Sequence, residues 1–524
     1  MSASAQAINQ EWAPSFNPWL IAASVMLATF MEVLDTSVAN VALPHIAGNL
    51  SASTDEATWV LTSYLVSNAI VLPITGWLGS RFGRKRLLIT CIIIFTISSA
   101  LCGAAGSLGF LIIARIIQGA GGGALQPIAQ AVLLESFPPE KRGSAMAIYG
   151  MGIIVAPIIG PTLGGWITDN YTWRWIFYIN VPVGALAVFM SQTFIEDPPY
   201  IRRVVNAGMD YIGFGLMAVG LAALQIVLDK GQEEDWFGSS LIVSLVIVTI
   251  VCLTFFVIWE LKVEHPIVNL RVLKNRNFGL GVLLILVVGA ILYGTTALLP
   301  IFLQTLMGYS ATQSGLAVSP RGLGSLISMF VVGRLIGKID SRYLMTIGFG
   351  TLALSVFLLG GINLQISITS VVWPNVINGL ALGFIFVPLT TTSMGTLANK
   401  EISNASGIYN LMRNIGGGLG ISLATTMLSR LGQFHQNNLS ANMSPLNPAF
   451  QETLHAFQGV FAGSGPATAT RQAYAAIYGI LSRQASLMAF VDIFRWEAII
   501  CLCCIPLVFI LKRVRASKSA APVH

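Results

Sequence analysis

Long apolar runs recur along the whole chain and constrain its fold more than any other feature. Stretches of about 20 residues with few charged side chains follow one another from Trp19 to Leu511. A helix needs about that many residues to cross the hydrocarbon core of a bilayer. Only 10% of the 524 residues are charged, whereas soluble domains carry about 25%. The sequence therefore predicts a multi-pass membrane protein and excludes a set of soluble domains.

The apolar runs predict an all-α membrane protein with fourteen spans in groups of six, two and six. We expect an N-terminal six-helix bundle at 1–194, a two-helix insertion with its connectors at 195–277, and a C-terminal six-helix bundle at 278–524. The last bundle includes a long polar segment, 431–485, on the external side. The predicted spans are residues 19–43, 57–79, 87–105, 109–134, 143–168, 175–194, 210–228, 239–260, 278–303, 313–336, 343–363, 372–397, 405–430 and 486–511.

Basic side chains gather in the short segments on one side of the predicted membrane. They cluster within residues 81–86, 262–276 and 512–518. Loops rich in Lys and Arg stay on the cytoplasmic side of a membrane. The pattern therefore predicts that both termini are cytoplasmic. It also explains the net charge of +7 without any binding to nucleic acid.

Short patterns recur at similar spacing in the two groups of six spans. Gln118-Gly119 is matched by Asn378-Gly379, and Leu43-Pro44 is matched by Leu299-Pro300. A coincidence is the alternative explanation of this spacing, because glycine and proline are common in membrane helices. A duplicated six-helix unit around a central cavity is the usual architecture of secondary transporters, and the pattern favours it.

The polar segment 431–485 has helical periodicity in its apolar residues. We expect two amphipathic helices that lie on the membrane surface or cap the C-terminal bundle. A docking surface for an extracytoplasmic partner is the alternative. The periodic residues are Phe450, Leu454, Phe457 and Phe461, and then Tyr474, Ile477 and Leu481.

No pattern for nucleotide binding, hydrolysis or metal binding is found. Gly333-x3-Gly337-Lys338 is one residue short of a phosphate-binding loop and lacks the following Ser or Thr. The six cysteines have no matching His or carboxylate cluster. The sequence therefore predicts no enzyme, no cofactor and no metal site, and it disfavours ATP as the energy source.

Charged residues within the predicted spans are the candidates for chemistry. Glu32 and Asp35 lie three positions apart, and so on one face of the first span. Arg115, in the fourth span, reaches a similar depth and can meet Asp35. Each such charge at the bilayer centre costs roughly 2.5–3.5 kcal/mol. A proton-binding site is one interpretation of these residues, and a permanent Asp35–Arg115 ion pair that locks two helices is the other. For Glu32 a purely structural role is equally open.

Small residues and prolines give the fourth and fifth spans faces for close helix approach and bending. Close packing without motion is the alternative to a role in gating. The residues concerned are Gly119, Pro157, Gly160, Pro161 and Gly164.

Several of these patterns together resemble a known family. Residues 34–44, Leu-Asp-Thr-Ser-Val-Ala-Asn-Val-Ala-Leu-Pro, resemble the first-helix signature of the fourteen-helix drug:proton antiporters of the major facilitator superfamily. Further motifs of that superfamily are similar to segments on the expected helices. These segments are Gly76-x-Leu78-Gly79-x-Arg81-x-Gly83-Arg84-Lys85 (motif A), Arg115-x2-Gln118-Gly119 (motif B), Gly152 through Gly160-Pro161-x2-Gly164-Gly165 (motif C) and 173–182.

The resemblance covers about residues 20–515 and is greatest to EmrB-like multidrug exporters. It implies proton-driven export of hydrophobic or cationic compounds by alternating access, with Asp35, Glu32 and Arg115 in proton coupling. It also implies an inner-membrane location and a membrane-fusion adaptor with an outer-membrane channel as partners. The residues expected to line the substrate cavity, besides the two acids, are Asn40, Tyr64, Asn68 and Gln118, of which Tyr64 and Asn68 can equally serve helix contacts.

Two alternatives to an exporter stay open at this point. An importer of the same fold, coupled by proton symport, is disfavoured by the resemblance to motif C. A membrane enzyme or sensor would need a reactive cluster or a sizeable soluble domain, and neither is found.

One departure from motif A affects the expected gate. The motif normally has Asp at its fifth position, where this chain has Ser80. In the family that Asp contributes to a charge relay at the cytoplasmic gate. Ser80 can only form hydrogen bonds, so the latch of the outward-facing state is in doubt.

Overall fold

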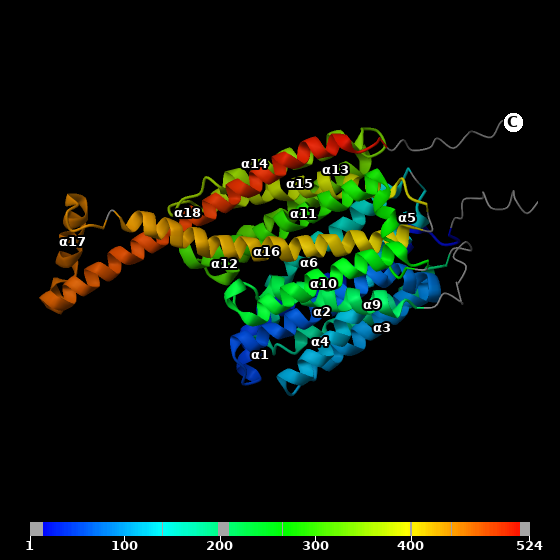
Figure 1. Cartoon of the computed structure of the whole chain (residues 1–524), viewed down its shortest axis with the longest axis horizontal. Helices are drawn as coiled ribbons and strands as arrows, with labels where there is room; N and C mark the ends of the chain where they lie inside the picture. Colours follow the sequence, from blue (N-terminus) through cyan, green and yellow to red (C-terminus); the bar gives the residue numbers. More distant parts are fainter. Residues whose placement is uncertain are drawn as a thin grey trace, which may run out of the picture.

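The computed structural model describes residues 14–138, 140–197, 209–264, 266–398, 401–441 and 443–513. Long helices run side by side through most of them (Figure 1). Thirteen helical segments of this part are long and apolar enough to cross a membrane. The two termini, predicted to be cytoplasmic, lie outside the described residues.

The first six predicted spans correspond to helices α1 to α8. The predicted span 109–134 consists of α4 and α5, which are separated at Gly123 and Ala124, after a run of glycines that weakens the helix. The helices are α1 (Pro18–Asn49), α2 (Thr54–Phe82), α3 (Arg84–Gly103), α4 (Leu108–Gly122), α5 (Leu125–Ser136), α6 (Arg142–Asn170), α7 (Trp175–Tyr178) and α8 (Asn180–Phe194).

The remaining eight predicted spans correspond to helices α9 to α18. The helix α16 contains the predicted span 405–430 and is not among the thirteen apolar segments, because polar residues and glycines interrupt its apolar sequence. The all-helical, fourteen-span fold is confirmed. The helices are α9 (Tyr211–Lys230), α10 (Ser240–Lys262), α11 (Arg276–Ile301), α12 (Ala311–Val318), α13 (Pro320–Leu335), α14 (Ser341–Leu359), α15 (Thr369–Met394), α16 (Ile402–Ser440), α17 (Pro448–Val460) and α18 (Pro466–Ile510), with a short π-helix, η4 (Phe302–Leu306), after α11.

Within each group of six spans, the same pairs pack together: the first span on the fifth, the second and third on the fourth, and the third on the sixth. In the first group α1 packs on α6, α2 on α4, and α3 on α4 and α8. In the last group α11 packs on α16, α15 on α13 and α14, and α18 on α14 and α16. Helices α13 and α15 meet α6, and α16 meets α2 and α5, so these contacts form a seam between the groups. The pair α9–α10 borders this seam through contacts of α9 with α2 and α16. The exact domain boundaries stay a prediction.

Residues 431–485, which we call the arm, differ from the expected pair of surface helices. Helix α16 continues to Ser440, and α18 is one helix of 45 residues that runs from the arm into the last span. No proline interrupts α18 before Pro506, so nothing in its sequence ends the helix where the apolar residues begin. The arm therefore projects from the bundle, with α17 near its tip (Figure 1). The helical periodicity was predicted correctly, whereas the orientation was wrong.

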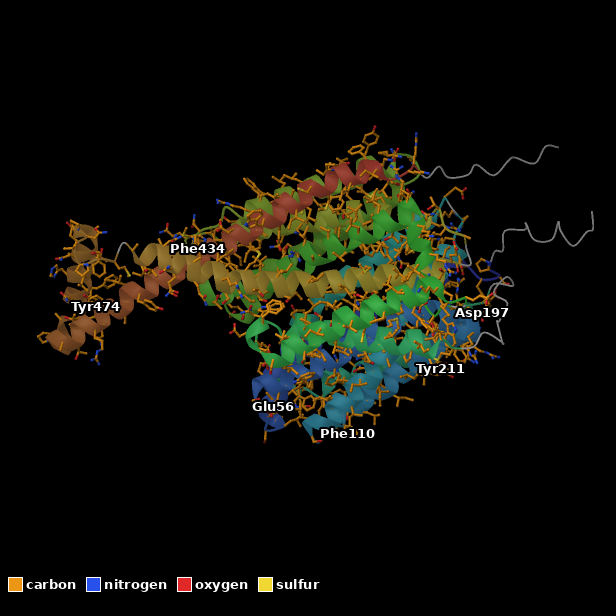
Figure 2. The ribbon with its side chains drawn as sticks, in the orientation of Figure 1. Glu56, Phe110, Asp197, Tyr211, Phe434 and Tyr474 are labelled. Carbon is orange, nitrogen blue, oxygen red and sulfur yellow. The ribbon has the colours of Figure 1, made fainter. Side chains whose placement is uncertain are left out.

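The two ends of the bundle differ in charge and shape. Asp197 and Tyr211 lie at the end away from the arm, and Glu56 and Phe110 lie at the arm end (Figure 2). The basic loops around Arg81–Arg86 belong to the former, which we call the basic end.

A network of charged and polar groups holds motif A at the basic end. Gly83 separates α2 from α3 with φ +86° and ψ 151°. Asp197 accepts a hydrogen bond of 2.9 Å from the backbone N–H of Lys85, at the start of α3, where a carboxylate is favourable. Arg84 forms an ion pair with Glu135 of α5. Acids from two other segments therefore interact with this motif.

The side chain of Ser80 does not take part in that network. Its hydroxyl donates to the carbonyl oxygen of Trp77, one turn earlier on the same helix, at 2.8 Å. The position where motif A normally has Asp thus holds a locally satisfied hydroxyl, and the carboxylates that contact this motif among the described residues are Glu135 and Asp197.

We expect Gly83→Ala to lower the free energy of unfolding by about 1–3 kcal/mol, because this backbone region is accessible almost only to glycine. A Cβ there would also lie 2.6 Å from Asp197 Oδ2. Thermal unfolding of the purified protein in detergent measures the change. Gly79→Ala is the control, because its Cβ would meet Ser403 Oγ at an ordinary 3.4 Å. Equal stability of the two variants would contradict the prediction.

Candidate functional site

Asp35 is buried in the first group of helices and accepts three hydrogen bonds. Arg115 Nη1 of α4 lies 2.6 Å from Asp35 Oδ2. Gln118 Nε2 of α4 and Asn180 Nδ2 of α8 donate to Oδ1 at 2.9 and 2.7 Å. The side chain is 2% exposed. Three donors, one of them a cation, thus satisfy both oxygen atoms of this buried carboxyl group.

Arg115 is fixed by contacts besides its ion pair. Its Nε donates to the carbonyl oxygen of Val60 at 3.1 Å, and Nη1 also donates to Gln118 Oε1 at 2.8 Å. The guanidinium lies 4.2 Å from the centroid of the Tyr64 ring, a cation–π contact. In this conformation the Asp35–Arg115 pair is therefore closed and links α1, α2 and α4.

Glu32 lies about one turn before Asp35 and accepts hydrogen bonds from neutral groups. Tyr64 Oη and Asn68 Nδ2 of α2 donate to Glu32 Oε1 at 3.1 and 3.3 Å. Gln126 Nε2 of α5 donates to Oε2 at 2.6 Å. The side chain is 3% exposed. Glu32 thus has no cation in direct contact among the described residues, unlike Asp35.

Gln126 connects Glu32 to the other group of helices. Its amide oxygen accepts a hydrogen bond from Arg413 Nη2 of α16. About one turn away on α16, Asn410 donates to Gln130 Oε1 of α5 at 2.9 Å. Both bonds cross the seam between the two groups of six spans. The amide side chain of Gln126 therefore connects the Glu32 carboxyl group with Arg413 across the seam.

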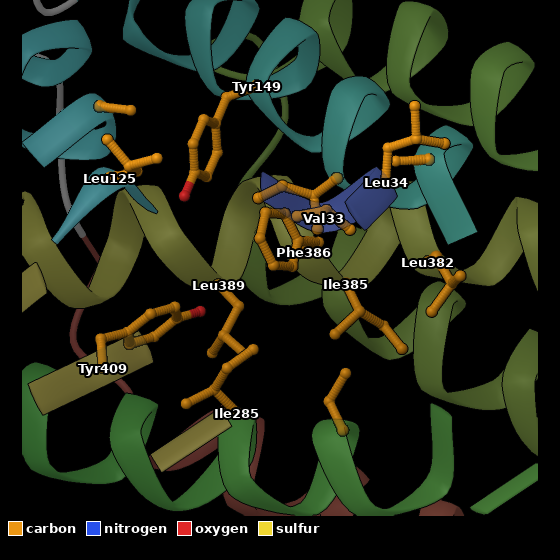
Figure 3. Close-up of a cluster of buried hydrophobic side chains, with 14 of the residues drawn as sticks. Val33, Leu34, Leu125, Tyr149, Ile285, Leu382, Ile385, Phe386, Leu389 and Tyr409 are labelled. Atoms are coloured by element: carbon orange, nitrogen blue, oxygen red, sulfur yellow. The ribbon is translucent and has the colours of Figure 1, made fainter. Parts of the chain in front are cut away.

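Apolar side chains surround the polar groups at the centre of the seam. Val33 and Leu34 of α1, the neighbours of Glu32 and Asp35, lie with Tyr149 of α6 and Phe386 of α15 in one cluster (Figure 3). A small cavity of about 20 Å³ adjoins it, and Arg413 is the one charged residue of its lining. The lining residues are Ile153, Ile285, Val288, Gly289, Leu292, Tyr293, Leu382, Phe386 and Arg413. The lining is mostly apolar, and the cavity is far smaller than a ligand pocket in this conformation.

The structure brings most of the predicted site residues together and leaves one apart. Arg115 and Gln118 contact Asp35, and Tyr64 and Asn68 contact Glu32. Asn40 is exposed on α1, and in the described part of the chain it forms no hydrogen bond with either acid.

The predicted glycines and prolines lie where helices approach closely. A Cβ on Gly119 would clash with the carbonyl oxygen of Tyr64, and one on Gly164 would lie 2.9 Å from Val38 Cγ1. Gly160 faces Ser37, whose hydroxyl donates to the carbonyl oxygen of Pro157 at 3.2 Å. Pro157 and Pro161 both lie inside α6, as predicted. Close helix packing therefore accounts for the small residues at these positions. A role of these residues in gating stays a prediction.

Sequence reasoning missed Asn180 and Gln126, and for Arg413, a single charge within a predicted span, it left open whether the side chain binds backbone carbonyls or lines the cavity. Asn180, Gln126 and Arg413 complete the two networks. Each is a polar residue within a predicted span, which is the signal that could have selected it. Their partners depend on helix rotation, which the sequence does not give. Among the described residues no three His, Cys, Asp or Glu side chains gather as a metal site requires.

Comparison with known proteins gives a consistent family assignment. The model of the Major Facilitator Superfamily matches residues 25–421. The chain is 43% identical over 438 residues to a Haemophilus influenzae protein named Multidrug export protein EmrB, covering 83% of this chain and 85% of the relative. It is 37% identical over 491 residues to Fatty acid resistance protein FarB of Neisseria gonorrhoeae, covering 93% and 95%.

Solved structures show the same fold at low sequence identity. The human organic anion transporter MFSD10 matches with a TM-score of 0.59 at 12% identity, covering 93% of this chain and all of that one. The proton:xylose symporter XylE matches with a TM-score of 0.58 at 16% identity, covering 93% and 96%.

We expect Asn180→Ala to lower the free energy of unfolding by about 1.5–3 kcal/mol, the range for a hydrogen bond to a charged group. The loss should be clearly smaller in an Asp35→Asn background, because the charge that Asn180 stabilises is then absent. Thermal unfolding of the four proteins of this double-mutant cycle measures the difference. Asn170→Ala, at an exposed position of α6, is the control. Equal losses in both backgrounds would show that Asn180 does not act through Asp35.

Proposed function

This chain belongs to the major facilitator superfamily, and from this membership we propose that it exports hydrophobic, often cationic, compounds in exchange for protons. Relatives at 40–43% identity are named multidrug export proteins, which favours export over the alternative of a proton-coupled importer. The likeness to a proton:xylose symporter concerns the fold alone.

The observation that carries this proposal is the pair of buried carboxylates on α1. Asp35 is paired with Arg115, and Glu32 is connected to Arg413 across the seam through Gln126. A proton on either acid removes a negative charge that its donors stabilise. Protonation of Glu32 would weaken the link across the seam, and protonation of Asp35 would release Arg115. Proton binding would thereby change the relative stability of two arrangements of the helices, which is the requirement for coupling.

Contacts between the two groups of helices support a conformation closed at the basic end. Gly76 of α2 lies against Asn404 of α16, where a Cβ would be 2.6 Å from Asn404 Cα. The Ser144 hydroxyl of α6 donates to the carbonyl oxygen of Gly333 of α13 at 3.0 Å. If the basic end is cytoplasmic, this conformation is closed to the cytoplasm. Substrate would then leave toward the arm end.

The substrate cavity in this proposal lies at the centre of the seam. Its walls would be the apolar cluster of Figure 3, which can receive an apolar molecule when the seam opens. The polar groups Tyr64, Asn68 and Gln118 would face it beside the two acids. Competition between a cationic substrate and protons for the acids would link export to proton entry.

The location and partners follow from the same proposal. We place the chain in the inner membrane of a bacterium with both termini in the cytoplasm, and a membrane-fusion adaptor and an outer-membrane channel as partners. The arm supports this, because it projects from the bundle and exposes apolar side chains. Phe434 is 58% exposed and Val460 74% exposed, and Figure 2 shows Phe434 and Tyr474 on the arm. We propose the arm as the contact with the adaptor.

We expect Asp35→Asn to reduce proton-gradient-driven efflux of a cationic dye by about 5- to 150-fold, the usual range of coupling between two sites. The amide keeps the size of the side chain but cannot bind and release a proton. Efflux from energised cells or everted vesicles, with and without an uncoupler, measures the effect. Asp169→Asn, an exposed acid at the arm end of α6, is the matched control. Full uncoupler-sensitive efflux by Asp35→Asn would remove Asp35 from proton coupling.

We expect Phe434→Glu with Val460→Glu to abolish co-purification with a membrane-fusion adaptor co-expressed with this protein, because charges in an apolar contact remain unpaired. Dye transport by the variant in proteoliposomes should stay at the wild-type level, since the arm lies outside the bundle. Glu452→Gln, an exposed change on α17, is the control. Retained adaptor binding would exclude these parts of the arm as the contact.

A further inference from the structure

Glu497 is a buried carboxyl group that the proposed coupling site does not use. It lies on α18, 13 residues before the helix ends at Ile510, which is about 20 Å along the axis. A hydrocarbon core of about 30 Å would therefore surround it. The residue is 8% exposed, and its side chain is directed toward α11 and α16. A carboxyl group at this depth needs a physical reason.

The neighbouring helices leave room for this carboxyl group. A Cβ on Gly294 of α11 would lie 3.0 Å from Glu497 Oε1 and 3.3 Å from the carbonyl oxygen of Gly420 of α16. A larger residue at Gly294 would displace the carboxyl group, whereas a Cβ on Gly420 would clash with the carbonyl oxygen of Ala290 of α11. Gly294 therefore makes room for the carboxyl group, and Gly420 allows α16 to pack closely against α11 beside it.

The hydrogen bonds at this site suit a protonated Glu497. Thr295 Oγ1 lies 2.6 Å from the carbonyl oxygen of Ile291 and 3.0 Å from Glu497 Oε2. A hydroxyl has one proton, which Thr295 can donate either to Ile291 or to Glu497, and it is assigned here to the shorter bond, with the Ile291 carbonyl oxygen. The contact with Glu497 is then favourable only if the carboxyl group donates to Oγ1. In the described part of the chain the carboxyl has no other hydrogen-bond partner, in contrast to the three donors around Asp35.

A buried cation with unused donors contacts α11 at the residue that follows Thr295. Arg321 of α13 is 3% exposed, and its Nε and Nη2 atoms have no hydrogen-bond partner among the described residues. Its Nη1 donates to Thr296, the neighbour of Thr295 on α11. The groups that interact electrostatically with Glu497 are Arg321 and, one turn along α18, Cys501. Arg321 and Glu497 thus contact adjacent threonines of α11, and they form no ion pair in this conformation.

We propose that Glu497 is a second proton-binding group, protonated in this conformation, which releases its proton and pairs with Arg321 in another step of the cycle. The O–H bond of the carboxyl group breaks and the proton passes to water, while Arg321 keeps its own protons. The new carboxylate meets the unused donors of Arg321 when α13 moves relative to α18. This proposal rests on the proposed proton-coupled export, and it adds a titrating site in the last group of helices.

Infrared spectroscopy of the purified full chain in nanodiscs tests the protonation itself. Wild type should show the carbonyl band of a protonated carboxyl group that Glu497→Gln lacks and Asp35→Asn retains. Thr295→Val should shift that band, because the protonated acid loses its acceptor. Thr295→Val keeps the test valid should Glu497→Gln fail to fold. A carboxyl region that is the same in wild type and Glu497→Gln, or an unshifted band in Thr295→Val, would overturn the proposal.

Proton release on dye binding tests the role of Glu497 in the cycle. Ethidium added to detergent-solubilised protein in weak buffer should release fewer protons from Glu497→Gln than from wild type, with Glu452→Gln of α17 as the control. Equal release from wild type and Glu497→Gln would overturn the role in the cycle. If wild type drives no ethidium against a gradient, the proposed export fails, and the infrared spectra still decide whether Glu497 is protonated.

Discussion

Charge buried at membrane depth is the constraint on which the centre of this structure depends. Each of the two acids of α1 would cost several kcal/mol in an apolar environment without partners. Asp35 and Glu32 avoid that cost by accepting hydrogen bonds from α2, α4, α5 and α8. The positions and rotations of these helices around α1 are therefore fixed by the need to direct polar side chains at the two carboxylates.

Glycines make this arrangement sterically possible. Side-chain amides and guanidinium groups reach a buried partner only if the helix backbones approach closely. Gly119 allows α4 to contact the carbonyl oxygen of Tyr64 on α2, directly beside the Arg115 network. Gly289 of α11 lies in the same way against the carbonyl oxygen of Arg413 on α16. The same residues that give the spans their smooth faces thus bring the charged groups within hydrogen-bond distance.

The polar contacts are of two kinds: those within one group of helices and those that cross the seam between the two groups. The Asp35–Arg115 pair joins helices of the first group only. The bonds from Arg413 to Gln126 and from Asn410 to Gln130 join the two groups. Only contacts of the second kind must break when the groups move apart, whereas those of the first kind can persist. Glu32, which is bound to Gln126, lies at the boundary between the two kinds.

Hydropathy and the depth of charged residues predicted the spans and the charged centre, because both depend on properties of single helices. A run of about 20 apolar residues needs no partner to be recognised, and depth along a helix predicted that Asp35 and Arg115 can meet. Only the tertiary structure decided that Asn180, Gln126 and Arg413 complete the networks. Their partners come from distant parts of the chain, and helix rotation selects them. The continuation of α18 into the arm was also visible only in the folded structure. Hydropathy marks where a helix leaves the membrane but not where the helix ends.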